Sequence, residues 1–168
     1  AESVQLIGTS GARQNETSLI ATTSQGNGNA GSVRINTPTL IVRDGAVMGA
    51  GSLLSRGNGG TIAINAQQLI VQNGASIAVA SLLSAGNAGT IAINASELVE
   101  LSGSEQPSSL AAGTQNGGKA GDVTIQTGQL IIGDRSRINV NSTRVEAPEL
   151  TPAELLALQR AGLTDLLD

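Results

Sequence analysis

The chain has 168 residues, a formal net charge of −4, 22 glycines, and no Phe, Tyr, Trp, Cys or His. This length is enough for one domain with a buried core, but aliphatic side chains alone have to fill it, which favours a narrow and regular interior. The lack of cysteine excludes a disulfide scaffold and a thiolate metal site, and no run of about 18 apolar residues is present to span a membrane. Residues 1–145 carry eight basic and eight acidic side chains, so the whole net charge lies on residues 146–168. A body without a basic patch argues against nucleic acid as a partner.

A repeat organises the middle of the chain. Segments 31–59 and 60–88 are identical at 14 of 29 paired positions, and each begins with glycine. A repeat of this length indicates one structural unit that is stacked on its neighbours. The next unit runs from Gly89 to the residue before Gly121 and is 32 residues long, so it carries three extra residues.

Each unit reads as three short strands. The first strand alternates apolar and polar residues, as SVRIN, TIAIN, TIAIN and DVTIQ, which is the period-two pattern of a half-buried strand. The second strand reads TLIV, QLIV, ELVEL and QLII, and it ends at a turn in each unit. In two units the turn is Asp44-Gly45 or Asn73-Gly74, where glycine accepts positive φ. The third strand is weaker, as AVMGA, ASIAVAS and SRINV, and a Gly/Asn turn then closes the unit.

Three strands per unit, each above its equivalent in the preceding unit, predict an all-β fold. We expect residues 1–145 to form a right-handed parallel β-helix of about four to five coils, where a coil is one turn of the solenoid. Four amide side chains fall in one column just past the first strand: Asn36, Asn65, Asn94 and Gln126. Amides stacked at this spacing hydrogen-bond from coil to coil, so we assign these four residues a structural role.

The third unit departs from the pattern in two places. Glu100 falls at the position of Val71 in the preceding unit, and a buried glutamate without a partner is unfavourable. We therefore expect a shift of one residue that turns Val99 and Leu101 inward. Residues 104–116 contain Pro107, which cannot donate to a strand ladder, and we expect them to replace the usual third strand with a looped-out corner.

The acidic segment 146–168 has a different pattern. Residues 151–154, Thr-Pro-Ala-Glu, combine an N-cap, a proline at the first helical position and a capping-box glutamate, so a short helix is predicted. Its leucines form a candidate interface: Leu155, Leu156, Leu158 and Leu163. Two interpretations stay open, a cap over the open end of the β-helix, or a clasp that docks on the next subunit in a head-to-tail assembly.

Patterns that suggest chemistry are better explained as architecture. Residues 26–31 match the dinucleotide pattern G-x-G-x-x-G, but a strand follows where that site needs a helix, so a structural corner is expected. Residues 117–122 resemble a calcium-binding glycine-aspartate repeat, which needs a period of about nine residues. Asp44 and Asp134 occupy similar corners about three coils, or roughly 14 Å, apart, beyond either glycosidase separation. No catalytic, cofactor-binding or metal-binding residue is predicted, and no cofactor.

Three segments carry a family resemblance: GNGGTIAINAQQLIVQNGASIAVAS (57–81), GNAGTIAINASELVELSG (86–103) and GDVTIQTGQLIIGDRSRINV (121–140). Together they resemble the haemagglutinin-like repeat exoproteins of Gram-negative bacteria, of the two-partner-secretion type and especially the cyanobacterial ones. The resemblance covers about residues 26–143 and implies a β-helix, an extracellular location, and a role as a surface adhesin or matrix component. It implies no catalytic residues. Those proteins are long and begin with a secretion domain, so this sequence is either a fragment of such an exoprotein or a small subunit made from the same repeat.

Three functions follow as hypotheses. The first is a non-enzymatic, extracellular structural or adhesive segment of a secreted surface or matrix protein, with cell-surface glycans or matrix as partners. The second is a subunit of an extracellular fibre that stacks head to tail on other copies through its open coil ends and its C-terminal helix. The third, which the scattered acids disfavour, is an enzyme that acts on polysaccharides.

Overall fold

The computed structural model describes residues 2–8, 18–25, 27–53, 57–82, 86–103, 105–115 and 117–143, and all the regular structure in these ranges is β-strand. Every strand pair is parallel and joins equivalent positions of adjacent repeats. The predicted parallel β-helix is therefore confirmed. The strands are β1 Ser3–Ile7, β2 Leu19–Ser24, β3 Ser32–Asn36, β4 Thr39–Arg43, β5 Val47–Leu53, β6 Thr61–Gln72, β7 Ser76–Leu82, β8 Thr90–Ser102, β9 Ser109–Gln115, β10 Asp122–Ile132 and β11 Arg137–Thr143.

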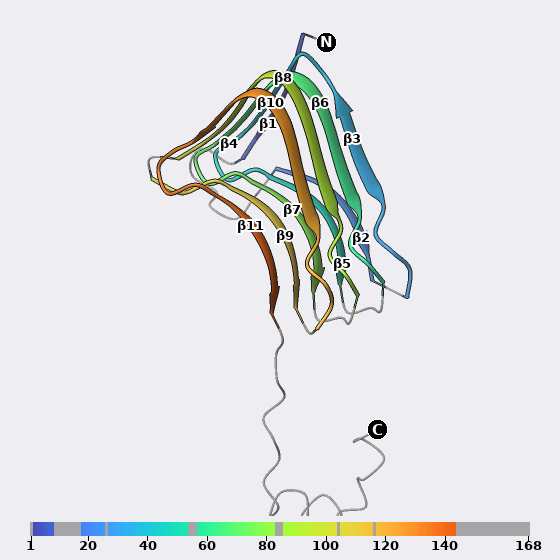
Figure 1. The fold of residues 1–168 in the computed structure, drawn as a ribbon. Helices are drawn as coiled ribbons and strands as arrows, with labels where there is room; N and C mark the ends of the chain where they lie inside the picture. Colours follow the sequence, from blue (N-terminus) through green and yellow to red (C-terminus); the bar gives the residue numbers. More distant parts are fainter. Residues whose placement is uncertain are drawn as a thin grey trace, which may run out of the picture.

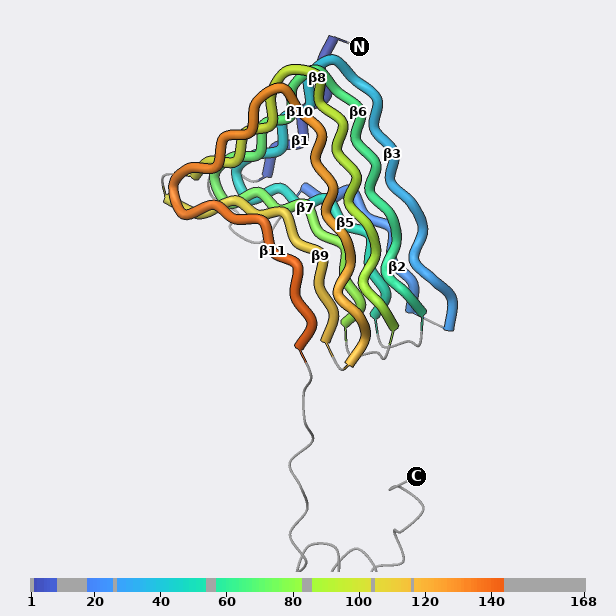
Figure 2. Tube along the Cα trace, in the orientation of Figure 1, coloured from blue at the N-terminus to red at the C-terminus, as the bar shows by residue number. Residues whose placement is uncertain are grey.

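Two parallel sheets enclose the interior. Sheet A has the order β1-β4-β6-β8-β10, with β3 beside β6, and sheet B has the order β2-β5-β7-β9-β11. In Figure 1 the long strands of sheet A rise to an apex and bend, and the strands of sheet B return beneath them. We number the coils from 1 to 5 by their strands: β1–β2, β3–β5, β6–β7, β8–β9 and β10–β11. The tube in Figure 2 shows that successive coils follow nearly the same path.

The first and second strands of a repeat run together in coils 3 to 5. There β6, β8 and β10 each continue over the apex as one bent strand. In coil 2 the same path is divided into β3 and β4 at Pro38, because proline has no N–H to donate to a ladder. Its carbonyl still accepts the N–H groups of Gln67 and Gln68, at 2.8 and 3.0 Å, so the connection between coils is maintained.

Inward side chains form aliphatic columns along the solenoid. One column holds Leu40, Leu69 and Val99, all completely buried, and Met48 lies completely buried opposite Ile77 in the register of sheet B. The interior is uniform because equivalent residues from successive coils lie directly above one another. This arrangement explains how the chain fills its core without an aromatic side chain.

Coil 4 absorbs its extra residues in two irregular places. Val99 and Leu101 are fully buried, which confirms the expected one-residue shift. The register shows where the shift occurs: Ala66 is paired with Ala95 but Gln68 with Leu98, so one extra residue is accommodated in a β-bulge.

The other irregularity is the corner before β9, where the structure describes residues 103 and 105–108. We expected residues 104–116 to replace the third strand, and this prediction is wrong, because β9 pairs in register with both β7 and β11. The insertion and Pro107 are confined to the corner that precedes the strand, where no ladder hydrogen bond is needed from the proline. The looped-out corner itself is present.

The segment 144–168 lies outside the described residues. The predicted helix and its leucines, Leu155, Leu156, Leu158 and Leu163, belong to this segment.

Candidate functional site: the polar columns at the coil corners

The Gly/Asn corner carries a column of asparagines that links four coils. The side-chain oxygen of Asn29 accepts the backbone N–H of Asn58, that of Asn58 accepts from Asn87, and that of Asn87 accepts from Lys119, each at 2.9 Å. Backbone bonds run beside them, including one from Ala30 N–H to the carbonyl of Asn58 at 2.9 Å. Both side-chain and backbone hydrogen bonds therefore join this corner from coil to coil.

Sequence reasoning recognised this turn but gave its asparagines no role. The signal was present in the 29-residue spacing of Asn29, Asn58 and Asn87. The same corner contains the described residues of the G-x-G-x-x-G pattern, 27–31, which lead directly into strand β3. The structure thus places that pattern in a stacked corner, while Gly26 lies outside the described residues.

Two columns of glycine flank the asparagines. A Cβ atom added to Gly57 would collide with the carbonyl oxygen of Gly28, and one added to Gly60 would collide with that of Gly31. The later coils repeat both collisions: Gly86 on Gly57, Gly118 on Gly86, Gly89 on Gly60 and Gly121 on Gly89. The marker glycines of the repeat are therefore required by the close approach of one coil to the next.

Hydroxyl side chains that face inward lie near the ends of the sheet B strands, next to this corner. They occupy one column by strand register: Ser24, Ser52, Ser81, Thr114 and Ser142. The hydroxyl of Thr114 is buried and donates to the carbonyl of Gly86 at 3.0 Å, and the hydroxyl of Ser142 donates to the carbonyl of Gly118 at 2.7 Å. Buried polar groups of this kind need such partners, and here the partner is the glycine corner itself.

The four predicted amides lie in one column at the upper part of sheet A. Strand register places Asn36 beside Asn65, Asn65 beside Asn94, and Asn94 beside Gln126, all on the exposed face. Asn65 donates its side-chain N–H to the side-chain oxygen of Asn36 at 2.8 Å. The column is brought together as expected, but on the outside of the solenoid, where water competes for the same groups.

The corner between sheets A and B uses left-handed backbone. Asp44, Asn73 and Asp134 have φ values of 56°, 51° and 52°. Glycine follows the first two, whereas Arg135, with φ of 60°, follows the third and is strained there. The side-chain N–H of Asn73 donates to the carboxylate of Asp44 at 3.2 Å, so this corner is also linked between coils.

Three of the described carboxylates, Asp44, Glu100 and Asp134, take part in contacts with neighbouring residues or coils. Asp44 lies 3.6 Å from the guanidinium of Arg43, and Asp134 accepts the backbone N–H of Gly103 at 3.3 Å. Glu100 points outward and accepts from the side chains of Gln72 and Ser102, at 3.3 and 3.0 Å, which explains why it is tolerated in that strand.

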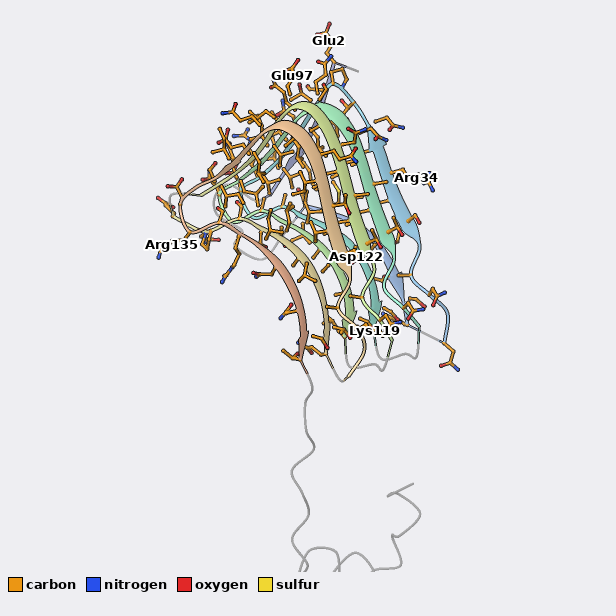
Figure 3. The ribbon with its side chains drawn as sticks, in the orientation of Figure 1. Glu2, Arg34, Glu97, Lys119, Asp122 and Arg135 are labelled. Atoms are coloured by element: carbon orange, nitrogen blue, oxygen red, sulfur yellow. The ribbon has the colours of Figure 1, made fainter. Side chains whose placement is uncertain are left out.

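The corner aspartates are three coils apart, since Asp44 belongs to coil 2, Asp134 belongs to coil 5, and coils 3 and 4 lie between them. Glu97 lies near the apex in Figure 3, Asp122 is the first residue of β10, and both are exposed. Across the described ranges, no group of three or more His, Cys, Asp or Glu residues is placed to hold a metal ion.

Comparison with protein families, with curated proteins and with solved structures finds no match to this chain. Within the described ranges there is no helix with the length and apolar character needed to cross a membrane. The haemagglutinin-like assignment therefore stays a prediction that rests on the repeat residues quoted above.

Proposed function

We propose that this chain is a non-enzymatic structural segment of a secreted surface or matrix protein, a stiff β-helical spacer whose outer faces are available for adhesion. One observation carries the proposal: the polar side chains that the repeat preserves are engaged between coils. Asn58 illustrates this, because it accepts a hydrogen bond from the following coil and donates its backbone N–H to the preceding one. Side chains committed to coil stacking favour a scaffold over a site for chemistry.

The physical properties of such a segment support this role. Parallel ladders join every pair of adjacent coils in both sheets, and the interior is a continuous aliphatic core. In a solenoid, only the strands at the two ends have unpaired backbone groups. The solenoid can therefore become longer by the addition of repeats without a change in its cross-section. Five coils at a spacing of about 4.8 Å give a height of roughly 20–25 Å.

The extracellular location rests on the resemblance to haemagglutinin-like repeats. It is tested with an antibody raised against residues 1–168 and applied to intact and permeabilised cells that produce the protein. We expect intact cells to be labelled, and brief protease treatment of those cells to remove the label. Labelling that requires permeabilisation would contradict a surface role.

The adhesive part needs its own measurement. Beads coated with folded protein should be retained on matrix or cell-surface glycans from the producing organism, and beads coated with heat-unfolded protein serve as the control. Equal retention of the beads with folded and with unfolded protein would contradict adhesion. The surface location would then still be tested by the antibody experiment.

The enzyme hypothesis is tested with a panel of polysaccharides. We expect purified protein to release no new reducing ends from any of them. Release that is lost in Asp44→Asn or Asp134→Asn would overturn the proposal, because these are the carboxylates at the left-handed corner.

A second function, the head-to-tail fibre, is favoured by one observation. Among the described strands, none pairs with the outer edge of β10 or of β11, so coil 5 presents backbone groups that another coil could meet. Sedimentation of the purified chain over a wide concentration range distinguishes the two proposals. A spacer stays at one mass, and a fibre subunit grows with concentration.

A further inference from the structure

Three inward columns of the solenoid end in exposed apolar side chains in coil 5, whereas Val123, Ile125 and Ile138 of the same coil stay partly buried. Leu130, Ile132 and Val140 are 45%, 46% and 50% exposed. Their partners in coil 4 are Val99, Leu101 and Ala112, and each of these is 0% exposed.

The cause of this difference is the missing cover. Leu130 and Val99 occupy the same column and face the same interior, but Val99 is covered by coil 5 and no described residue covers Leu130. The open end therefore presents a patch of apolar side chains, which we call the end patch and define as Leu130, Ile132 and Val140. Large apolar side chains exposed at the end of a solenoid indicate that something packs on them.

Coil 5 differs from the others in ways that disfavour a further coil on top. Segment 57–82 contains no charged residue, whereas 117–143 contains five: Lys119, Asp122, Asp134, Arg135 and Arg137. Charged side chains on an edge coil hinder the addition of another strand. Lys119 also ends the asparagine column, because an ammonium group has no acceptor for the N–H of a following coil.

We infer that segment 144–168 of the same molecule packs on the end patch through its leucines. The segment follows directly on Thr143, the last residue of β11, so it starts on the coil that needs covering. It contains seven leucines in 25 residues. Extended, 25 residues reach up to about 80 Å, whereas β11 is about 23 Å long, so length does not limit the contact.

Charge complementarity points to the same occupant. Segment 144–168 carries five acidic residues against two arginines. Arg135 and Arg137 are exposed on the coil whose interior is open, and Figure 3 shows Arg135 at the corner, directed away from the sheets. Opposite charges at the rim favour this orientation of the segment, while apolar contacts with the end patch supply the affinity.

The first test measures whether the end patch is covered in the full chain, which has no cysteine of its own. Val140→Cys is introduced, and its reaction with a thiol reagent is timed with and without the changes Leu155→Ser, Leu156→Ser and Leu158→Ser. We expect the serine changes to speed the reaction by about tenfold or more, because they release the cover. Leu19→Cys, at the 61% exposed Leu19 of coil 1, is the matched control and should react equally fast in both backgrounds.

The second test locates the contact and does not depend on the serine changes. The pair Val140→Cys and Leu156→Cys should form a disulfide within one chain under mild oxidation. The pair Leu19→Cys and Leu156→Cys should not. A non-reducing gel and the mass of the linked peptides give the result.

Three outcomes would overturn the inference. One is a Val140→Cys reaction rate that is the same with and without the serine changes, in chains whose circular dichroism is unchanged. Another is a disulfide that joins two chains. The last is protection that increases with protein concentration, which would identify a second copy as the occupant.

Discussion

Replacing Gly60 by alanine tests whether the marker glycines are required by coil stacking. The added Cβ would collide with the carbonyl oxygen of Gly31 and would lie 2.9 Å from the Cβ of Ala50. The Gly31 carbonyl is part of the backbone, so the collision can be avoided only if the two coils move apart. That movement weakens the hydrogen bond from Thr61 N–H to the Gly31 carbonyl, which is 3.2 Å long. Overpacking costs about 1–3 kcal/mol and a lost backbone bond about 1 kcal/mol, so we expect Gly60→Ala to lower the free energy of unfolding by about 2–4 kcal/mol.

Two other glycines provide matched controls. At Gly49 the nearest atom to an added Cβ is the carbonyl oxygen of Ala78 at 3.9 Å, so Gly49→Ala should raise stability by about 0.4–1 kcal/mol through the unfolded state. At Gly45 the Cβ would meet nothing within 4 Å, but φ is +76°. Gly45→Ala should therefore cost about 1–2 kcal/mol from backbone strain alone.

Urea unfolding followed by far-ultraviolet circular dichroism measures all three variants, since the chain has no Trp or Tyr for fluorescence. With a denaturant dependence of about 2 kcal/mol per molar urea, Gly60→Ala should lower the midpoint of unfolding by roughly 1–2 M. The reasoning is refuted if Gly60→Ala stays within about 1 kcal/mol of the unchanged chain, or if Gly49→Ala destabilises it as much.

The same assay checks three further predictions. Asn58→Ala should lower the free energy of unfolding by about 0.5–1.5 kcal/mol, because the N–H of Asn87 loses its acceptor at 2.9 Å. Asn58→Asp keeps an acceptor oxygen and should cost less. Equal losses of stability in the two variants would contradict the role of that hydrogen bond. Leu69→Ala in the buried column should cost about 2–5 kcal/mol, whereas Leu19→Ala at an exposed site should be nearly neutral, and similar values for both would argue against the assigned interior. Arg135→Asn should raise stability by about 1 kcal/mol, because asparagine tolerates the left-handed backbone better than arginine, and a loss would show that the arginine side chain makes a contact of greater value.

The candidate site was only partly predictable. The column of Asn36 and Asn65 was expected, because amides recurring every 29 residues stack if the chain forms coils. The column of Asn29 and Asn58 was missed, although its spacing is the same. Sequence reasoning treats asparagine next to glycine as a turn former, and only the positions of the backbone N–H groups show that its side chain bonds to the next coil.

By itself, the sequence determined the parallel β-helix, the inward alternation of the strands and the inward shift of Val99 and Leu101. The fold and the alternation follow from the 29-residue spacing of the repeat, and the shift follows from the high free energy of burying the charge of Glu100. Both signals can be read from the sequence of the repeats. Only the tertiary structure decided that Pro107 falls in a corner and leaves β9 intact. It also decided that the first and second strands of a repeat join into one bent strand in coils 3 to 5, and that two sheets enclose the core. Tertiary structure also decided that Leu130 and Val140 are exposed while their column partners are buried. Burial depends on what lies above a residue in the stack, and that neighbour belongs to another coil.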